Sequence, residues 1–253
     1  MAVIYEPSGK AREYSPLACN LYLGCNHGCR YCYMPGVLRK SREQCLFPIE
    51  RGGIVQSFEK EAEQRFGSDV PILFCFMSDP YNEAETEKRI TRRCLEIANR
   101  CKLKIKILTK SKTVLRDMDL FREFGDRINV GMTLTFFDEA KSREWEPRAS
   151  SPRERIETLL ELKSRGVRTW ASFEPVIEPE ESLRMMTECV GLVDFWKIGK
   201  LNNYMGLDKK IDWTNFLKRA LAICRGHGEI YVKKDLREAA GSVKLFENET
   251  RME

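Results

Sequence analysis

The chain has 253 residues, of which 42% are hydrophobic and 32% are charged, with a formal net charge of +5. This composition is ordinary for a soluble globular protein with a full apolar core. No apolar run approaches the roughly 20 residues that a membrane-spanning helix needs, and the polar stretch 1–14 lacks a signal region, so we predict a cytoplasmic protein without a membrane partner. The mildly basic charge permits a nucleic-acid partner without requiring one.

Short β-rich runs alternate with helical ones along the chain, which is the pattern of a parallel α/β fold. Strands are predicted at residues 18–23, 70–77, 103–109, 128–135, 167–173 and 192–199. Helices are predicted at residues 50–66, 86–101, 112–124, 152–165 and 179–189. An amphipathic helix at 212–225, a strand at 229–232 and a final helical turn follow.

Six successive βα units predict a parallel sheet that closes partway into a barrel, a partial (β/α)6 barrel, with its helices outside. The run 70–77 is almost continuously apolar, as expected for a strand buried on both faces. We find no linker or repeat, and so we predict one domain over residues 1–253. Its core covers about 14–203, and a short C-terminal α/β extension covers about 204–253.

Three cysteines follow the first predicted strand with the spacing C-x3-C-x2-C: Cys25, Cys29 and Cys32. Gly28 supplies the backbone freedom that so tight a loop needs. Ordinary iron–sulfur sites use four cysteines, one for each iron. Three thiolates without a fourth partner would leave one iron open to a ligand that the protein does not supply.

Two other interpretations of the three thiols remain open. Together with His27 they could form a Cys3His zinc site, although His27 lies inside the same small loop and the usual two separated ligand pairs are absent. They could also be unrelated core cysteines. Six of the other cysteines lie in apolar or helical stretches, where a free thiol packs as a small hydrophobe: Cys19, Cys75, Cys94, Cys101, Cys189 and Cys224. Cys45 falls in a predicted loop.

Polar residues gather directly after the predicted strands, at the edge of the sheet where barrels of this kind hold their sites. They are Ser78 to Tyr81, Thr109 to Ser111, Thr133 to Thr135, Glu174 with Pro175, and Lys197 to Lys200. Exposed strand ends are polar in many proteins, so the order of these motifs carries more weight than any one residue.

The C-x3-C-x2-C spacing followed by an aromatic residue resembles the signature of radical S-adenosylmethionine enzymes. Ser-Asp-Pro-Tyr at 78–81, Thr-Lys-Ser at 109–111 and Val-Gly-x-Thr-x-Thr at 130–135 come after it in that order. This series resembles the spore photoproduct lyase-like branch of the superfamily, over roughly residues 14–203. The six-unit partial barrel of that family, with its cluster in the loop after the first strand, is similar to the fold predicted here.

The resemblance implies a [4Fe-4S] cluster on Cys25, Cys29 and Cys32, with S-adenosylmethionine on the open iron. It also implies that the cofactor is contacted by Ser78, Asp79, Lys110 and Thr133, and by the backbone of Tyr33 at its adenine. The charges agree, because an ammonium group needs an acceptor such as Asp79 and a carboxylate needs a cation such as Lys110. The implied mechanism is one-electron reduction by a donor such as flavodoxin or ferredoxin, which yields a 5′-deoxyadenosyl radical that abstracts hydrogen from a substrate.

The substrate is less constrained. The resemblance and the basic stretch 200–237, with nine Lys or Arg against four acidic residues, favour a nucleic acid or nucleotide. A peptide or a small metabolite is the alternative, and a non-catalytic zinc or iron–sulfur module is a third possibility. Candidate substrate residues at the barrel mouth are Glu174, Lys197, Lys200, Asn202 and Asn203, with Lys197 or Lys200 expected to neutralise Glu174. Cys75 is predicted to face away from Ser78 and to pack in the core.

Overall fold

A computed structural model describes residues 2–202 and 204–251, and its centre is an eight-stranded sheet in the order β1-β2-β5-β6-β7-β8-β9-β10. The strands are β1 (Ile4–Tyr5), β2 (Leu17–Cys19), β5 (Ile72–Phe74), β6 (Ile105–Thr109), β7 (Ile128–Thr133), β8 (Arg168–Phe173), β9 (Phe195–Ile198) and β10 (Glu229–Val232). Only β1 is antiparallel to its neighbour; the other paired strands of this sheet are parallel. Strands β3 (Tyr22–Leu23) and β4 (Ile49–Glu50) form a separate antiparallel pair.

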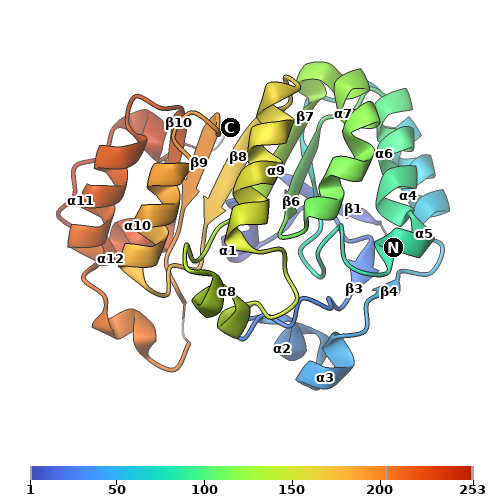
Figure 1. Cartoon of the computed structure of the whole chain (residues 1–253). Helices are drawn as coiled ribbons and strands as arrows, with labels where there is room; N and C mark the ends of the chain where they lie inside the picture. Colours follow the sequence, from blue (N-terminus) through green and yellow to red (C-terminus); the bar gives the residue numbers. More distant parts are fainter. Residues whose placement is uncertain (1, 203, 252–253) are drawn as a thin grey trace.

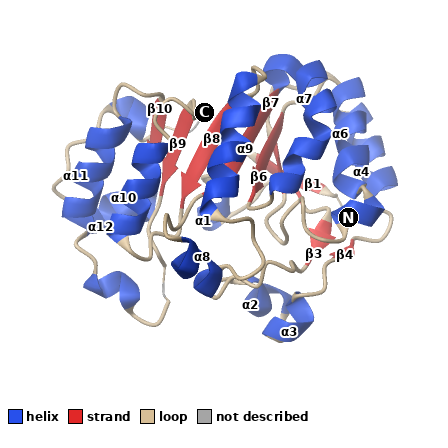
Figure 2. Cartoon of the chain, viewed as in Figure 1, coloured by secondary structure: helices blue, strands red, loops and turns tan. Residues whose placement is uncertain are grey.

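The larger helices pack along the outside of the sheet (Figure 1): α4 (Ile54–Glu63), α6 (Ile90–Arg100), α7 (Met118–Phe124), α9 (Pro152–Ser164), α10 (Pro179–Glu188) and α11 (Trp213–Cys224). The shorter helices α2 (Met34–Leu38), α3 (Arg42–Cys45) and α8 (Glu139–Trp145) lie beyond the carboxyl ends of the parallel strands (Figure 2). The remaining helices are α1 (Gly9–Arg12), α5 (Glu85–Lys88) and α12 (Lys234–Ala240), with 3-10 turns η1 (Lys112–Asp117), η2 (Gly125–Arg127), η3 (Leu207–Lys210) and η4 (Glu247–Glu249). Within the described residues, no helix is long and apolar enough to cross a bilayer.

The predicted α/β class with a mostly parallel sheet is confirmed, and the strand predicted at 229–232 adds itself to that sheet beside β9. The helix predicted at 152–165 begins with a reciprocal cap, because Ser151 Oγ accepts from the Glu154 N–H and Glu154 accepts from the Ser151 N–H. The helix predicted at 112–124 is wrong in its first half, which is the 3-10 turn η1.

The single strand predicted at 18–23 is also wrong, because the chain leaves the main sheet at Asn20. The Asn20 side chain accepts hydrogen bonds from the backbone N–H groups of Phe76 and Met77, at 2.7 and 2.9 Å, and donates to Tyr5. These bonds take the place of a continued backbone ladder. The freed chain forms β3, which enters the cysteine loop from a second, smaller sheet.

The face of the sheet that the large helices do not cover carries a separate apolar cluster of Ala18, Leu73, Trp170, Phe195 and Tyr231. Trp170 lies directly on Gly131, where any Cβ atom would overlap the indole ring. Glycine at this position therefore allows the bulky ring to pack flat against the strand.

Lys197 lies on the same face, 2% exposed, with its ammonium 4.6 Å from the ring centre of Tyr14 and 4.2 Å from that of Tyr231. It donates a hydrogen bond to the Glu13 carbonyl. Burial, together with the positive charges of Lys233 and Lys106, lowers the pKa of Lys197 to about 7.

This lowered pKa predicts a pH-dependent contribution to stability. Between pH 7 and the ordinary pKa of 10.5, Lys197 is mostly neutral in the folded protein but protonated in the unfolded chain. Unfolding then takes up a proton, so the destabilisation caused by Lys197 is greatest below pH 7 and disappears as the pH rises toward 10.5. We expect the free energy of unfolding of the native chain to increase relative to that of Lys197→Met between pH 7 and 10, in urea titrations followed by circular dichroism. A difference that does not change with pH would contradict the assignment.

Candidate active site

The cysteine loop lies at the carboxyl edge of the parallel sheet and borders a cavity of about 510 Å³. A volume of this size is typical of a site for a small molecule or cofactor. The cavity is lined by all three thiols of the loop and by the other predicted cofactor residues, namely Tyr33, Ser78, Asp79, Lys110 and Thr133. The structure therefore brings every predicted cofactor residue to one cavity, although the role of each remains a prediction.

Backbone hydrogen bonds hold the cysteine loop from two sides. On one side the Cys25 N–H donates to the Cys45 carbonyl at 2.7 Å. On the other the Arg30 N–H donates to the Trp145 carbonyl at 2.9 Å. Gly24 has φ +79°, and a Cβ atom there would lie 2.8 Å from the Cys45 carbonyl oxygen. Only glycine allows this close approach without a shift of the backbone.

A buried ion pair holds the cysteine loop in place through Tyr31. Glu146 and Arg155, 2% and 1% exposed, are 2.5 Å apart, and the Tyr31 hydroxyl donates to Glu146. Arg155 also donates to the carbonyls of Ser150 and Thr133, at 2.8 and 3.0 Å. Tyr31, between the last two cysteines, is thus tied to the strand end that carries Thr133. The sequence analysis missed both charged residues, since nothing in their spacing distinguishes them from surface charges.

The thiols lie in surroundings that disfavour a free thiolate. Burial raises the pKa of Cys29 to about 11, and burial with the nearby charge of Asp79 raises the pKa of Cys25 further. Bound metal removes this penalty, because a coordinating thiol is deprotonated outright. The donor set therefore suits a cationic inorganic group.

A zinc site and an iron–sulfur cluster require different arrangements of the three thiols. In the described part of the chain, no three His, Cys, Asp or Glu side chains converge as one metal ion would require. The zinc interpretation needs such convergence, whereas a cluster takes each thiolate on a different iron. His27 instead lies against Asp79, with its Nδ1 atom 3.5 Å from Oδ2, and burial lowers the pKa of His27.

Asp79 ties the loop after β5 to the end of β6. Its Oδ1 atom accepts from the Tyr81 N–H at 2.8 Å and the Thr109 hydroxyl at 2.6 Å, while Oδ2 accepts from the Lys110 N–H at 2.8 Å. Oδ1 is thus saturated, whereas Oδ2 accepts one hydrogen bond, lies 3.5 Å from His27 Nδ1, and keeps acceptor capacity for a ligand.

The Lys110 ammonium lies 5.7 Å from the ring centre of Tyr31 and, among the described residues, has no carboxylate within ion-pair distance. Burial acts to lower its pKa, but the negative charges of Cys29 and Glu146 outweigh burial, so the pKa is raised. The side chain is therefore a cation at the cavity wall, as a carboxylate ligand would require.

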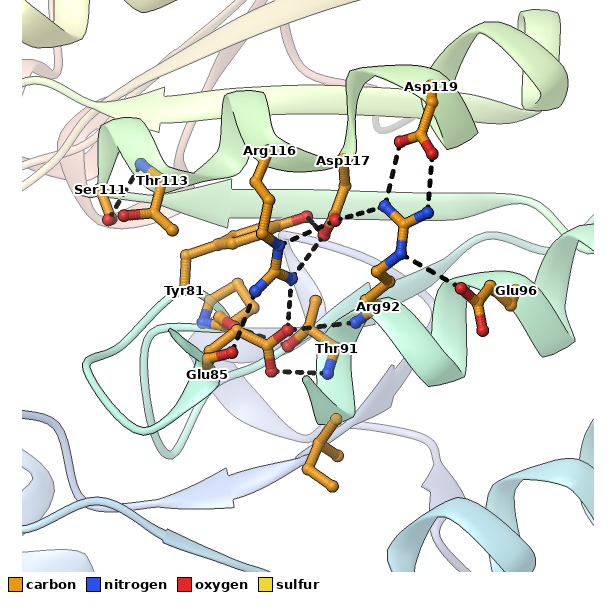
Figure 3. Close-up of polar contacts among 12 residues, drawn as sticks. Tyr81, Glu85, Thr91, Arg92, Glu96, Ser111, Thr113, Arg116, Asp117 and Asp119 are labelled. Atoms are coloured by element: carbon orange, nitrogen blue, oxygen red, sulfur yellow. Dashed lines mark hydrogen bonds and ion pairs between the residues drawn. The ribbon is translucent and has the colours of Figure 1, made fainter. Parts of the chain in front are cut away.

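A second buried network braces the same loops from the helical side (Figure 3). Glu85, fully buried, accepts from Arg116 at 2.5 Å and from the Tyr22 hydroxyl at 2.5 Å. Asp117, also fully buried, accepts from Arg116 at 2.8 Å and from Tyr81 at 3.0 Å. Tyr22 precedes the cysteine loop and Tyr81 follows Asp79, so the network links both segments to η1. Losing one partner of such a buried pair costs about 3–5 kcal/mol.

The predicted partners of Glu174 are wrong. Its carboxylate accepts two hydrogen bonds from Lys233, at 2.9 and 2.8 Å, and one from Tyr14. Lys233 follows β10 and reaches Glu174 because that strand pairs with β9. Gly199 leaves room for the carboxylate, since a Cβ atom there would lie 2.7 Å from Glu174 Cδ.

The predicted substrate residues do not all lie at the cavity. Glu174, Lys200 and Asn202 line the cavity, and Lys200 lies 3.4 Å from Asp208. Lys197 is not among the lining residues. Asn203 lies outside the described residues.

The other cysteines agree with the prediction of buried, unpaired thiols, and all ten cysteines are free. Cys75 packs in the apolar core, as predicted, and its sulfur accepts from the Leu21 N–H at 3.3 Å, but it also reaches the cavity wall. Cys45 ends α3 and is buried, so the predicted loop at that position is wrong.

Several known proteins are similar to this chain. An uncharacterized protein of Methanocaldococcus jannaschii is 31% identical over 162 residues, which cover 62% of this chain and 59% of that protein. The SuiB protein of Streptococcus suis bound to S-adenosylmethionine superposes with TM-score 0.66 at 13% identity, over 90% of this chain and 53% of SuiB. SuiB has also been solved with its precursor peptide SuiA.

Spore photoproduct lyase complexed with dinucleoside spore photoproduct superposes with TM-score 0.61 at 12% identity, over 96% of this chain and 66% of that chain. At these identities the two solved structures share the fold. The chain spans about three fifths of the length of the curated relative.

The family model described as the radical SAM superfamily matches residues 19–193, a stretch that begins in β2 and includes the cysteine loop, the ends of β5 to β8 and helix α10. The match covers more than half of the chain and agrees with the fold and with the residues around the cavity. The chain belongs to the radical S-adenosylmethionine superfamily.

Proposed function

We propose that this protein is an enzyme that holds a [4Fe-4S] cluster on Cys25, Cys29 and Cys32 and cleaves S-adenosylmethionine reductively. One observation carries the proposal: three thiols of a single clamped loop line the same cavity as Asp79 and Lys110. When bound, the cluster and S-adenosylmethionine supply a carbon radical that removes hydrogen from a substrate. The protein orients the cofactor and excludes competing reactions.

The chain's own residues have separate tasks in this proposal. Lys110 is the cation for the cofactor's carboxylate, and the free acceptor capacity of Asp79 Oδ2 suits its ammonium. Ser78 and Thr133 border the same space, and the Tyr33 hydroxyl donates to the Phe76 carbonyl at 2.7 Å, which fixes the ring at the cavity rim. The bracing by Glu146 and Arg155 keeps the loop in place before any ligand binds.

The test is anaerobic reconstitution with iron and sulfide, followed by reduction with dithionite in the presence of S-adenosylmethionine. We expect about four irons per chain and formation of 5′-deoxyadenosine. Replacement of Cys25, Cys29 or Cys32 by Ala should abolish both. Cys45→Ala is the matched control and should leave both intact, because the backbone carbonyl of residue 45, which accepts from the Cys25 N–H, is kept in this variant. Bound zinc without cleavage, or a complete cluster in a Cys29→Ala variant, would refute the proposal.

We further propose a nucleic acid or nucleotide as the substrate. Of the lysines at the cavity wall, Lys10, Lys200 and Lys233 each pair with a carboxylate, so the support comes from the surrounding stretch 200–237, which carries nine Lys or Arg against four acidic residues. Such an excess of positive charge favours a phosphate-bearing molecule. The dinucleoside complex of spore photoproduct lyase supports this class, whereas the peptide complex of SuiB supports the alternative.

Binding measurements distinguish these substrates. We expect a single-stranded oligonucleotide to bind, and its affinity to fall steeply as salt rises, since each neutralised phosphate releases counterions. Lys200→Ala should weaken binding and reduce the salt dependence, whereas Lys209→Ala, an exposed control in η3, should change it less. Fluorescence anisotropy from 50 to 300 mM salt measures both. Oligonucleotide binding that is absent or insensitive to salt would favour a peptide or a small metabolite.

A further inference from the structure

Residues 34–51, from α2 through β4, form a layer directly outside the cysteine loop, and we call them the outer segment. In Figure 1, α2 and α3 lie beyond the carboxyl ends of the strands. Two contacts join this segment to the thiol loop: the Cys45 carbonyl accepts from the Cys25 N–H at 2.7 Å, and Arg42 donates to the Cys29 carbonyl at 3.2 Å. The solvent-facing side of the outer segment is therefore close to the thiols.

The outer segment exposes apolar side chains at an unusual density. Val37, Phe47 and Ile49 are 55%, 73% and 51% exposed. They are three of the ten large apolar side chains that are exposed in the described part of the chain, yet the segment is only 18 residues long. Exposed apolar residues that are this frequent in one short segment are typical of an interaction surface.

The same segment is basic. It contains four Lys or Arg against two Glu, and Arg39 and Lys40 are both exposed. Among the described residues, no carboxylate lies within ion-pair distance of either of these two side chains, whereas Glu50 lies 3.9 Å from Lys88. Apolar side chains with polar and charged residues around them are the usual anatomy of a transient protein interface.

We propose that the outer segment is the docking surface for a one-electron carrier protein whose surface around its redox group is acidic. This inference rests on the proposed function, because a reductively driven cluster needs such a donor. In the step concerned, the carrier is oxidised by one electron and the cluster is reduced by one electron, and no bond forms or breaks.

Two features favour this partner over a nucleic acid at the same surface. Electron transfer requires a short path between the two redox groups, and the outer segment contacts the thiol loop directly. Surfaces that bind single-stranded nucleic acid stack bases on aromatic rings, and Phe47 is the one aromatic among the three exposed apolar side chains. Redox encounters are also small and weak, so a segment of this size is sufficient.

The test compares two reductants on the reconstituted enzyme, reduced flavodoxin as the acidic protein donor and dithionite as the small-molecule donor. In the Arg39→Glu, Lys40→Glu double variant, we expect 5′-deoxyadenosine formation at subsaturating flavodoxin to fall about tenfold. The dithionite-driven rate should be unchanged. The matched control is the double variant Arg65→Glu, Arg122→Glu. These two exposed arginines lie near the carboxyl ends of α4 and α7, away from the outer segment. This control should change neither rate.

Phe47→Ser and the salt dependence of the native enzyme provide independent measurements if the double variant folds poorly. Phe47→Ser should lower only the flavodoxin-driven rate, and rising salt should lower the flavodoxin-driven rate more than the dithionite-driven rate. A flavodoxin-driven rate that survives charge reversal would overturn the inference. So would loss of oligonucleotide binding with unchanged flavodoxin-driven turnover, which would assign the surface to nucleic acid.

Failure of the proposed function itself gives a different result. In that case the native chain forms no 5′-deoxyadenosine with either reductant. Calorimetric titration of flavodoxin into the native chain and the double variant still tests docking, because binding does not require turnover. Weaker binding to the double variant supports the surface, and equal binding to both chains overturns it.

Discussion

In the proposed function the rest of the structure serves one constraint, which is that three thiols in a buried loop have to lose their protons to bind iron. Burial alone opposes this and raises the pKa values of Cys25 and Cys29. A rigid loop and a neighbouring cation offset this cost of deprotonating buried thiols. Gly24 permits the close approach to the Cys45 carbonyl, and Lys110 adds positive charge at the cavity wall. The proposed cluster would supply the remaining positive charge.

Two buried ionic networks make the cysteine loop rigid, and they contact the segments around the cavity on different sides. The pair of Glu146 and Arg155 holds Tyr31 and the strand end at Thr133, while Glu85 with Arg116 holds Tyr22 at the entrance of the loop. Buried ion pairs contribute little net stability compared with apolar packing, but each is costly to break. Their value here is positional, since they fix the segments that carry the proposed cofactor contacts before a ligand binds.

Sequence reasoning predicted the parts of this site that follow local rules. The spacing of the three cysteines, and the rule that polar residues after parallel strands meet at one edge, were enough to identify the cavity residues Ser78 and Lys110. It failed where a distant segment decides the outcome. Lys233 reaches Glu174 only because β10 pairs with β9, and no local sequence pattern predicts that pairing.

The split of the first predicted strand has the same kind of cause, because the Asn20 side chain bonds to a loop 56 residues later in the chain. Glu146 and Arg155 were missed since their burial depends on the packing of α8 and α9. The cavity, by contrast, is built from strand ends whose order in the sheet follows from the parallel topology, and this is why its residues could be anticipated.

The central claim is that the three-thiol loop leaves one iron of a cluster free for the cofactor. The most direct measurement is electron–nuclear double resonance on the reduced, reconstituted protein with S-adenosylmethionine labelled with ¹⁷O in its carboxylate and ¹⁵N in its amino group. Our account predicts hyperfine coupling of both labels to the cluster, with weaker signals in Lys110→Ala. A reduced cluster that shows no coupling to either label, although the cofactor is bound, would contradict it.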